Sequence, residues 1–486
     1  MKYSELNIVD LHRLLVDGEI NSKDLIDHAI SLAKEDDNNC FEYICEKESY
    51  QQLNELDPSK KNCLLYGIPF VLKDNFSTKD IPTTASSNIL NGYKPIFSSE
   101  VYQRLIDNGA ILIGKTTMDE LAMGGMGVTG HLGKIYNPWD PKHEHIVGGS
   151  SGGSASAVSA GIVPFSIGSD TGDSVRKPAS YSGIVGFKPT WGRISRHGLF
   201  PFAPSLDTVG FFTKSVADSA IVLGALAGED EKDTTCAKQK VDKYFENLND
   251  NISGKRIAII DEIVEQTKDE NILKSFNDSV ALLASLGAQI NHITIDKEIL
   301  RAVYPTYVII SCSESSSNNA NLDGIKFGNR IEGNSYEETV IKSRSEGFSA
   351  PIKKRFIIGG YALSSVEEDN LYVKALRARR LIVDSINKIL EDNDVIYLPS
   401  SPTTAPRFDV SFDKMSDAFL IGENHLPMNN FSGLPSLTLP IGFSNNMPFG
   451  ANITGRAFGE QTVLNVALAL ENKLGLKDLQ PKKDKK

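Results

Sequence analysis

Residues 147–183 read VGGSSGGSASAVSAGIVPFSIGSDTGDSVRKPASYSG, a stretch in which glycine, serine and alanine dominate. Each glycine costs stability unless its permissive backbone angles or its missing Cβ are needed, so this density indicates that something lies very close to the backbone. A flexible linker would explain the glycine and serine alone. Residues 155–160, however, read as a helix of small residues, and residues 162–167 read as a short apolar strand. The stretch is therefore expected to be folded and to form a site.

Three motifs resemble those of the amidase signature family. GGSSGGS at residues 148–154 and GSDTGDSVRKPA at residues 168–179 lie within this stretch, and GIPFVLKD at residues 67–74 lies upstream. The length and spacing of the first two make the resemblance specific. It implies a Ser-Ser-Lys triad, in which Ser174 is the nucleophile, Lys73 is the base, and Ser150 is a proton bridge held by a cis peptide bond.

The residue types of this triad suit the chemistry. A serine hydroxyl is a weak nucleophile until an adjacent base takes its proton. A lysine serves as that base only when it is neutral, and burial among apolar residues such as residues 70–72 lowers its pKa. The short side chain of Ser150 can relay the proton from Ser174 to Lys73.

The resemblance also implies an oxyanion hole made of consecutive backbone N–H groups, those of Thr171, Gly172, Asp173 and Ser174. Asp170 and Arg176 are expected to orient this loop. Members of the family usually carry glycine where this chain has Asp173. On one interpretation, the carboxylate opposes the developing negative charge, or the position demands a positive φ. On the other, only the N–H is used and the side chain points away. We favour the second, because aspartate is among the residues enriched at positive φ.

Two other motifs suggest different chemistry. GAILIGKT at residues 109–116 matches the Walker A pattern of nucleotide triphosphatases, but its four central residues are themselves an apolar strand, whereas a phosphate loop follows a strand and presents open N–H groups. His143 and His145 flank Glu144, yet no partner recurs at a metal-ligand spacing. We therefore expect neither a nucleotide site nor a metal site here.

Composition bounds the remaining choices. The 486 residues are 40% hydrophobic and 23% charged, and the formal net charge of −11 provides no overall basic field for nucleic acid. Five scattered cysteines without a C-x-x-C pair indicate neither disulfides nor zinc. Residues 1–6 lack the apolar core of a signal peptide, and no run approaches a membrane span. A cytoplasmic protein that contacts no membrane is expected, with an organellar location, such as the mitochondrial matrix, left open.

The order of elements favours an α/β fold. Apolar residues at helical spacing predict a helical segment over residues 1–60, with an N-cap at Ser22. From residue 61, short apolar runs alternate with helical stretches, which is typical of a sheet flanked by helices. The resemblance implies one compact amidase signature domain over residues 61–476, built on a central mixed β-sheet. Residues 255–286 are expected to add a strand and a helix to that sheet, and the basic tail at residues 477–486 is expected to be disordered.

The C-terminal third resembles one branch of the family, the A subunits of glutamyl-tRNA(Gln) amidotransferases. The similar stretches are residues 304–310, 313–318, 322–324, 344–348, 354–359 and 362–365. In that branch, three side chains grip the substrate glutamine. Carried over, they are Arg355 for the α-carboxylate, Tyr307 in a strand, and Glu423 for the α-ammonium, where the family has aspartate. The resemblance further places Met123, Gly124 and Gly125 in a loop that lines the substrate pocket, although methionine is also a common filler of cores.

The proposed grip has a physical rationale. Free glutamine carries a carboxylate and an ammonium, so a selective site needs a guanidinium and an opposing carboxylate. Without the resemblance, Arg355 would be interpreted as a surface residue of the basic cluster at residues 353–355. Two alternatives stay open. A stand-alone amidase of small amides would share the triad, and a catalytically inactive scaffold is disfavoured by the presence of all three triad residues but kept open by Asp173.

The resemblance implies glutamine hydrolysis through a γ-glutamyl ester on Ser174. The ammonia would pass to a partner B subunit, which converts Glu-tRNA(Gln) to Gln-tRNA(Gln), and a small third subunit would complete a heterotrimer. No cofactor is expected in this chain. ATP and magnesium are expected on the B subunit, and the tRNA is expected to bind mainly through that partner.

Overall fold

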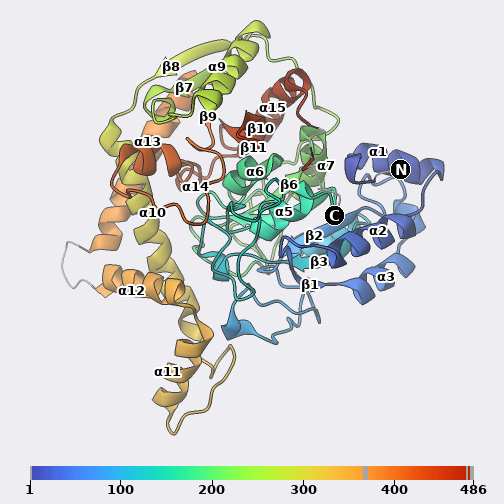
Figure 1. Ribbon diagram of the computed structural model, residues 1–486, viewed down its shortest axis with the longest axis vertical. Coiled ribbons are helices and arrows are strands. Elements are labelled where there is room, and N and C mark those ends of the chain that lie inside the picture. The colour runs from blue at the N-terminus through green and yellow to red at the C-terminus, as the bar shows by residue number, and fades with distance from the viewer. Residues whose placement is uncertain (1–2, 365–369, 478–479, 482–486) are drawn as a thin grey trace.

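The computed structural model describes residues 3–364, 370–477 and 480–481. In this described part of the chain, eleven strands form one mixed sheet with the order β1-β3-β2-β4-β6-β5-β10-β11-β9-β7-β8 (Figure 1). The strands are β1 (Phe41–Ile44), β2 (Pro69–Lys73), β3 (Ile111–Thr116), β4 (Phe165–Asp170), β5 (Val185–Lys188), β6 (Thr208–Thr213), β7 (Arg256–Ile260), β8 (Gln289–Ile293), β9 (Val395–Pro399), β10 (Ser436–Ser444) and β11 (Met447–Gly455). The predicted fold class, a mixed β-sheet flanked by α-helices, is confirmed.

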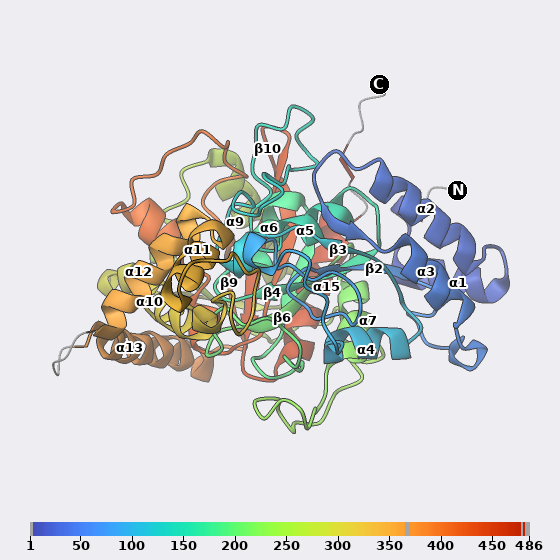
Figure 2. The ribbon, with the colours of Figure 1, turned by 90° about the horizontal axis from the view of Figure 1, so that it is seen from below.

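Helices cover both faces of this sheet (Figure 2). They are α1 (Ile8–Asp17), α2 (Ser22–Lys34), α3 (Glu46–Asn54), α4 (Glu100–Asp107), α5 (Gly152–Ser159), α6 (Arg176–Ser182), α7 (Val216–Leu226), α8 (Asp261–Val264), α9 (Glu270–Ser285), α10 (Lys297–Asn318), α11 (Tyr336–Gly347), α12 (Ala350–Ser364), α13 (Leu371–Asp392), α14 (Met428–Phe431) and α15 (Glu460–Leu474).

Strand β2 shows how the alternation of side chains divides the core. Phe70 and Leu72 point into the core that α4, α7, α9 and α15 cover. Val71 points to the opposite face, into the core formed with α2, α5 and α6. Because successive side chains of a strand point to opposite faces, Lys73 is on the same face as Val71. The lysine is thereby directed toward the helices α5 and α6.

The functional residues meet at one edge of the sheet. Strands β2 and β4 run parallel, with Leu72 opposite Ile167. Since the carboxyl ends of parallel strands share an edge, Lys73 at the end of β2 and Asp170 at the end of β4 lie close together. Two connections cover this edge. One is the turn between β4 and α6, and the other is the segment that leads into α5. Ligands of open α/β sheets bind at such edges.

Helix α10 corrects one expectation from the sequence. Tyr307 was expected in a strand, because the resemblance to the amidotransferase A subunits implied one there. The structure places it in α10, a helix of 22 residues with Pro305 inside it. Its residues Val303, Thr306 and Ile310 are buried at helical spacing, and α10 packs along α12 and α13.

The N-terminal segment is helical, as predicted, with the three α-helices α1, α2 and α3, but the prediction misses strand β1. β1 pairs antiparallel with β3, so this segment is joined to the main sheet. The N-cap of α2 is Asn21 rather than Ser22, because the Asn21 side chain accepts a hydrogen bond from the N–H of Asp24 at 2.9 Å. The predicted addition of a strand and a helix near residues 255–286 is confirmed by β7 and α9.

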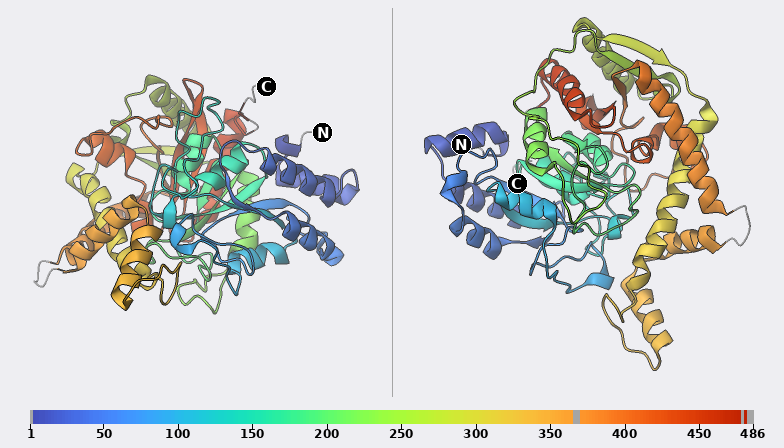
Figure 3. Two further views of the ribbon diagram at one scale, coloured as in Figure 1. Left: turned by 60° about the horizontal axis from the view of Figure 1, so that its bottom comes forward. Right: turned by 180° about the vertical axis from the view of Figure 1, so that it is seen from behind.

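Helices α10, α11 and α12 lie on the side of the molecule opposite α1–α3, and α11 projects beyond the rest (Figures 1 and 3). No helix in the described part of the chain is long and apolar enough to cross a membrane. The disorder predicted for the basic tail falls mostly on residues 478–479 and 482–486, which lie outside the described residues.

Candidate active site

Lys73 lies at the centre of the site with none of its surface exposed. Its Nζ donates hydrogen bonds to Ser150 Oγ at 2.7 Å and to Ser169 Oγ at 2.9 Å. Burial lowers the pKa of Lys73 to about 7, although the carboxylates of Asp119, Asp170 and Asp207 act in the opposite direction. A large fraction of this lysine is therefore neutral near pH 7 and able to accept a proton.

Ser169 is a site residue that the motif analysis did not single out. Its hydroxyl lies between two nitrogen donors, Lys73 Nζ at 2.9 Å and Asn75 Nδ2 at 3.0 Å. Since both contacts occupy its acceptor positions, Ser169 fixes the position of the lysine amine. The signal was available, because Ser169 belongs to the same GSDTGDS motif as Ser174.

A second buried lysine provides a comparison. Lys188 in β5 is also fully buried, and burial, reinforced by Arg176, lowers its pKa to about 7. Its Nζ, however, donates to two backbone carbonyls, those of Leu434 at 2.6 Å and Pro189 at 3.1 Å. Of these two lysines, only Lys73 contacts serine hydroxyls. A lowered pKa alone would therefore not have identified the catalytic base.

Ser150 is held by the backbone around it. The peptide bond between Gly149 and Ser150 is cis. A Cβ at Gly149 would lie 2.0 Å from Asp119 Oδ2, so only glycine fits there. The carboxylate of Asp119 accepts hydrogen bonds from the N–H groups of Gly127 and Val128, both at 2.9 Å. Asp119 thus connects the Ser150 turn to the neighbouring loop.

Ser174 begins the turn into α6 and is 2% exposed. Within the described residues, its hydroxyl has no hydrogen-bond partner, and the N–H groups of Gly172, Asp173 and Ser174 donate no hydrogen bond. Catalytic hydrogen bonds often form only once substrate is bound. Three consecutive amides without an internal acceptor are what an oxyanion hole requires.

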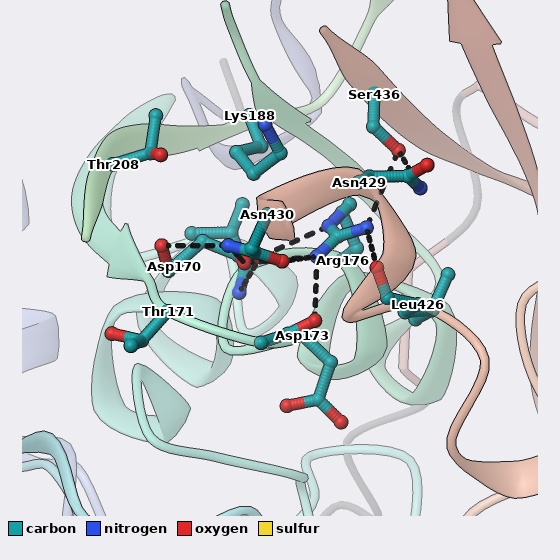
Figure 4. A network of polar contacts seen from close by, with 12 residues as sticks. Asp170, Thr171, Asp173, Arg176, Lys188, Thr208, Leu426, Asn429, Asn430 and Ser436 are labelled. Atoms are coloured by element: carbon teal, nitrogen blue, oxygen red, sulfur yellow. Dashed lines mark hydrogen bonds and ion pairs between the residues drawn. The ribbon is translucent and has the colours of Figure 1, made fainter. Parts of the chain in front are cut away.

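Asp170 and Arg176 form a fully buried ion pair beneath this turn (Figure 4). Arg176 Nη2 donates to Asp170 Oδ1 at 2.9 Å and to the carbonyl oxygen of Gly172 at 2.7 Å. Asn430 Nδ2 donates to the same carboxylate oxygen at 2.9 Å. Burial alone would raise the pKa of Asp170, but Arg176 holds it at about 2. The network fixes the path of the loop from Asp170 to Ser174, in line with the orienting role expected for both residues.

Asp173 points away from Arg176 (Figure 4). Its Oδ2 lies 3.2 Å from Nζ of Lys177, one helical turn further on. The residue has no positive φ, so the position does not demand a left-handed backbone. The Lys177 ammonium, which also pairs with Glu423, offsets only part of the charge of this carboxylate beside the expected oxyanion hole.

Tyr307 comes to this loop from α10. Burial raises the pKa of its phenol, and Arg355 of α12 lies near enough to Tyr307 to oppose that rise. A Cβ at Gly172 would lie 2.8 Å from the ring of Tyr307, so the phenol packs directly on the loop. Arg355 is half-buried, with its guanidinium 5.9 Å from the ring centroid of Phe202, whereas Lys354 beside it is exposed. The surface interpretation of Arg355 is therefore not supported.

Glu423 ends a short π-helical segment, Ala418–Glu423, and is already engaged by protein groups. Its Oε1 accepts hydrogen bonds from Lys177 Nζ at 2.9 Å and from the Tyr181 hydroxyl at 3.0 Å. Its Oε2 accepts one from Ser401 Oγ at 2.8 Å. Glu423 lies near the site, but its carboxylate oxygens are satisfied without a ligand.

The loop at residues 123–125 lies near Ser150. Met123 is 1% exposed and belongs to the core beneath α10 and α13. A Cβ at Gly124 would lie 2.3 Å from Cγ of Asp119, whereas a Cβ at Gly125 would meet no atom within 4 Å. Met123 therefore packs in the core, Gly124 permits the close approach of Asp119, and only Gly125 faces open space.

The Walker A-like stretch at residues 109–116 and the segment from His143 to His145 have structural roles. Residues 111–116 form β3, and Lys115 makes a buried ion pair with Asp74 at 3.1 Å, so this stretch is no phosphate loop. His145 Nδ1 lies 2.7 Å from Asp140 Oδ2. Among the described residues, no three His, Cys, Asp or Glu side chains gather as a metal-binding group.

A buried lysine hydrogen-bonded to Ser150 and Ser169, with Ser174 at a turn of free amides, is the arrangement of a serine amidohydrolase. Comparison with known proteins agrees: the model of the family described as Amidase matches residues 25–464. The chain belongs to the amidase family.

Three relatives show where in the family its similarities lie. The chain is 39% identical to the A subunit of the glutamyl-tRNA(Gln) amidotransferase of Pediococcus pentosaceus over 476 residues, which are 97% of each protein. A crystal structure is known for the A subunit of the glutamyl-tRNA(Gln) amidotransferase of Thermotoga maritima. Its TM-score to this chain is 0.80 at 34% identity, covering 97% of this chain and 96% of that one. The peptide amidase of Stenotrophomonas maltophilia has a TM-score of 0.82 at 25% identity, covering 97% and 98%. The fold is thus shared across the family, and sequence identity is higher to the two amidotransferase subunits.

Proposed function

We propose that this chain is the glutamine-hydrolysing subunit of a glutamyl-tRNA(Gln) amidotransferase. It supplies the ammonia with which the complex converts Glu-tRNA(Gln) to Gln-tRNA(Gln). The observation that carries the chemistry is the contact of 2.7 Å between the buried amine of Lys73 and the hydroxyl of Ser150, next to the turn of Ser174. The similarity over nearly the whole length to amidotransferase A subunits supports the biological role.

The reaction begins with a proton relay. Lys73 takes the proton of Ser150, which takes the proton of Ser174, and Ser174 Oγ attacks the γ-carbonyl carbon of glutamine. The N–H groups of Gly172, Asp173 and Ser174 stabilise the negative charge on the carbonyl oxygen. The same relay returns a proton to the leaving nitrogen, which departs as ammonia. A water molecule then attacks the γ-glutamyl ester and releases glutamate.

The residues proposed to bind the charged groups of glutamine distinguish this function from that of a stand-alone amidase. Tyr307 of α10 packs on the loop of Ser174, and Arg355 of α12 is near enough to oppose the rise that burial causes in the pKa of Tyr307. A guanidinium in this position would suit the α-carboxylate of an amino acid. An amidase for uncharged amides needs no such group. An inactive scaffold is not favoured either, because Lys73 retains both a lowered pKa and its serine contacts.

The partners follow from the proposed role. A B subunit would hold ATP and magnesium, bind most of the tRNA and receive the ammonia, and a small third subunit would complete the complex. The net charge of −11 agrees with a tRNA that binds mainly through the partner. The expected location is the compartment in which tRNA is aminoacylated, in the cytoplasm or in an organelle.

Ammonia release from glutamine tests this function. The wild-type chain and Ser174→Ala are assayed alone and together with B and third subunits from an amidotransferase, Glu-tRNA(Gln) and ATP. We expect release that increases with the partner subunits and is lost in the variant. Cleavage of simple amides that depends on Ser174, without any release from glutamine, would instead identify a stand-alone amidase.

A further inference from the structure

Three charged side chains next to the nucleophile form a compact group, Asp173, Lys177 and Glu423. Lys177 Nζ lies 3.2 Å from Asp173 Oδ2 and 2.9 Å from Glu423 Oε1. The Lys177 side chain is only 5% exposed, so both contacts are shielded from solvent. With both acids ionised, the group carries two negative charges and one positive charge. One negative charge is left without a balancing cation.

The two acids differ in what already binds them. Lys177, Tyr181 and Ser401 all donate hydrogen bonds to Glu423. Asp173 has the single ion pair with Lys177 and no other hydrogen bond to its carboxylate among the described residues. Its side chain is also the more exposed, at 19% against 12% for Glu423. The uncompensated charge is therefore accessible at Asp173.

Asp173 lies close to Tyr307, one of the residues expected to bind glutamine. Gly172, its neighbour, packs against the ring of Tyr307. Burial raises the pKa of the Tyr307 phenol, and the charges of Arg355 and Asp173 both act on it, the first lowering and the second raising that pKa. A guanidinium and a carboxylate thus lie near one phenol, next to Ser174. This arrangement matches the two charges of a free amino acid.

We propose that Asp173 binds the α-ammonium of the amino-acid substrate, and that Glu423 acts through Lys177 as a positioning residue. The inference rests on the proposed function, because it takes glutamine as the substrate. Binding of the ammonium neutralises the charged group, so Asp173 no longer opposes negative charge in the adjacent oxyanion hole. A substrate without an ammonium leaves that charge in place. Asp173 is in this way a specificity-determining residue for α-amino acids.

The test compares L-glutamine with glutaramate, the same molecule without its amino group. Both are assayed for ammonia release with wild type, Asp173→Asn, Glu423→Gln and the surface control Asp409→Asn, in the complex with the partner subunits. We expect Asp173→Asn to lower kcat/KM for L-glutamine by about 10- to 100-fold and not to lower it for glutaramate, as loss of one charged hydrogen bond requires. We expect Asp409→Asn to match the wild type.

Equal losses for both substrates would overturn the proposal, because a merely structural pair with Lys177 would affect them alike. A loss selective for L-glutamine in Glu423→Gln but absent in Asp173→Asn would assign the ammonium to Glu423 instead.

Calorimetric binding of both compounds to Ser174→Ala, with and without Asp173→Asn, provides a readout without turnover. If Asp173→Asn weakens the binding of L-glutamine but not that of glutaramate, the proposal is supported. If the binding of L-glutamine is unchanged, the proposal is overturned. If Ser174→Ala binds no L-glutamine and the wild type releases no ammonia from it, the proposed function itself fails and the inference falls with it.

Discussion

The amine of Lys73 lies 2.7 Å from the hydroxyl of Ser150, and among the described residues no carboxylate is close enough to form an ion pair with that amine. Its polar contacts are with serine oxygens, those of Ser150 and Ser169. A buried lysine without a counter-ion loses much of the stabilisation of its charged form. This relationship gives Lys73 the ability to act as a base.

The activity should therefore follow the ionisation of Lys73. Its pKa is lowered to about 7, and only the neutral amine accepts a proton, so kcat/KM for glutamine should increase about tenfold per pH unit below pH 7 and level off above it. Lys73→Arg, which keeps a charge at every accessible pH, should lose about 10²- to 10⁴-fold in kcat/KM. A pH profile that is flat between pH 5.5 and 8 would contradict the assignment of Lys73 as the base.

Arg176→Met should be strongly destabilising. The variant leaves the Asp170 carboxylate buried without its partner, which costs about 3–5 kcal/mol in the free energy of unfolding. The matched control is Arg301→Met, which breaks a partly exposed pair with Asp417 and should cost about 0–1 kcal/mol. Urea denaturation of the three proteins measures both values, and a similar small cost for both variants would show that the buried network does not stabilise the fold.

The contribution of this network also depends on pH. The folded pKa of Asp170, about 2, is lower than its ordinary value of 3.8. The stability that the pair provides is thus present above pH 4 and lost as the pH falls toward 2. The difference in unfolding free energy between wild type and Arg176→Met should accordingly shrink in acid.

Gly124→Ala and Gly125→Ala should differ although they are neighbours. A Cβ at residue 124 would lie 2.3 Å from Cγ of Asp119, and one at residue 125 would meet nothing within 4 Å. Gly124→Ala should destabilise the chain by about 1–3 kcal/mol and reduce ammonia release, because it displaces Asp119 and with it the Ser150 turn. Gly125→Ala should retain the stability of the wild type. Thermal unfolding and the glutaminase assay distinguish them, and equal behaviour would refute the close packing on Asp119.

Arg355→Lys should weaken glutamine binding selectively. A lysine cannot reproduce the planar, two-pronged contact of a guanidinium with a carboxylate, so KM for glutamine should increase about 10- to 100-fold while kcat changes less. Lys354→Ala, one residue away and exposed, is the control and should leave KM unchanged. Should Arg355→Lys keep the KM of the wild type, the α-carboxylate is bound elsewhere.

The motifs allowed much of the site to be predicted. The helix expected at residues 155–160 and the strand at 162–167 correspond to α5 and β4, with their bounds shifted by up to three residues. Lys73 and Ser169 come together because the parallel strands β2 and β4 end at the same edge of the sheet, and Ser150 meets the lysine from the turn before α5. The proximity of these residues depends on the topology of the sheet. From the sequence it could be predicted only because the motifs occur in an order that is distinctive of the family.

The sequence could not provide the contacts between distant segments. The ion pair that joins Lys177 to Glu423 connects residues separated by 246 positions, and no periodicity encodes it. Tyr307 was assigned to a strand on the resemblance alone, whereas the segment is helical and packs against α12 and α13. Ser169 was overlooked because its contact with the amine of Lys73 depends on the position of that amine in the folded chain.

The most direct test of the central claim is to trap the acyl intermediate. The chain, in complex with its partner subunits, is mixed with glutamine, quenched in acid within a turnover, digested and analysed by mass spectrometry. We expect a γ-glutamyl group on the peptide that contains Ser174, and its loss in Ser174→Ala. A γ-glutamyl group on any other residue, or ammonia release from glutamine that persists in Ser174→Ala, would contradict the assignment of Ser174 as the nucleophile.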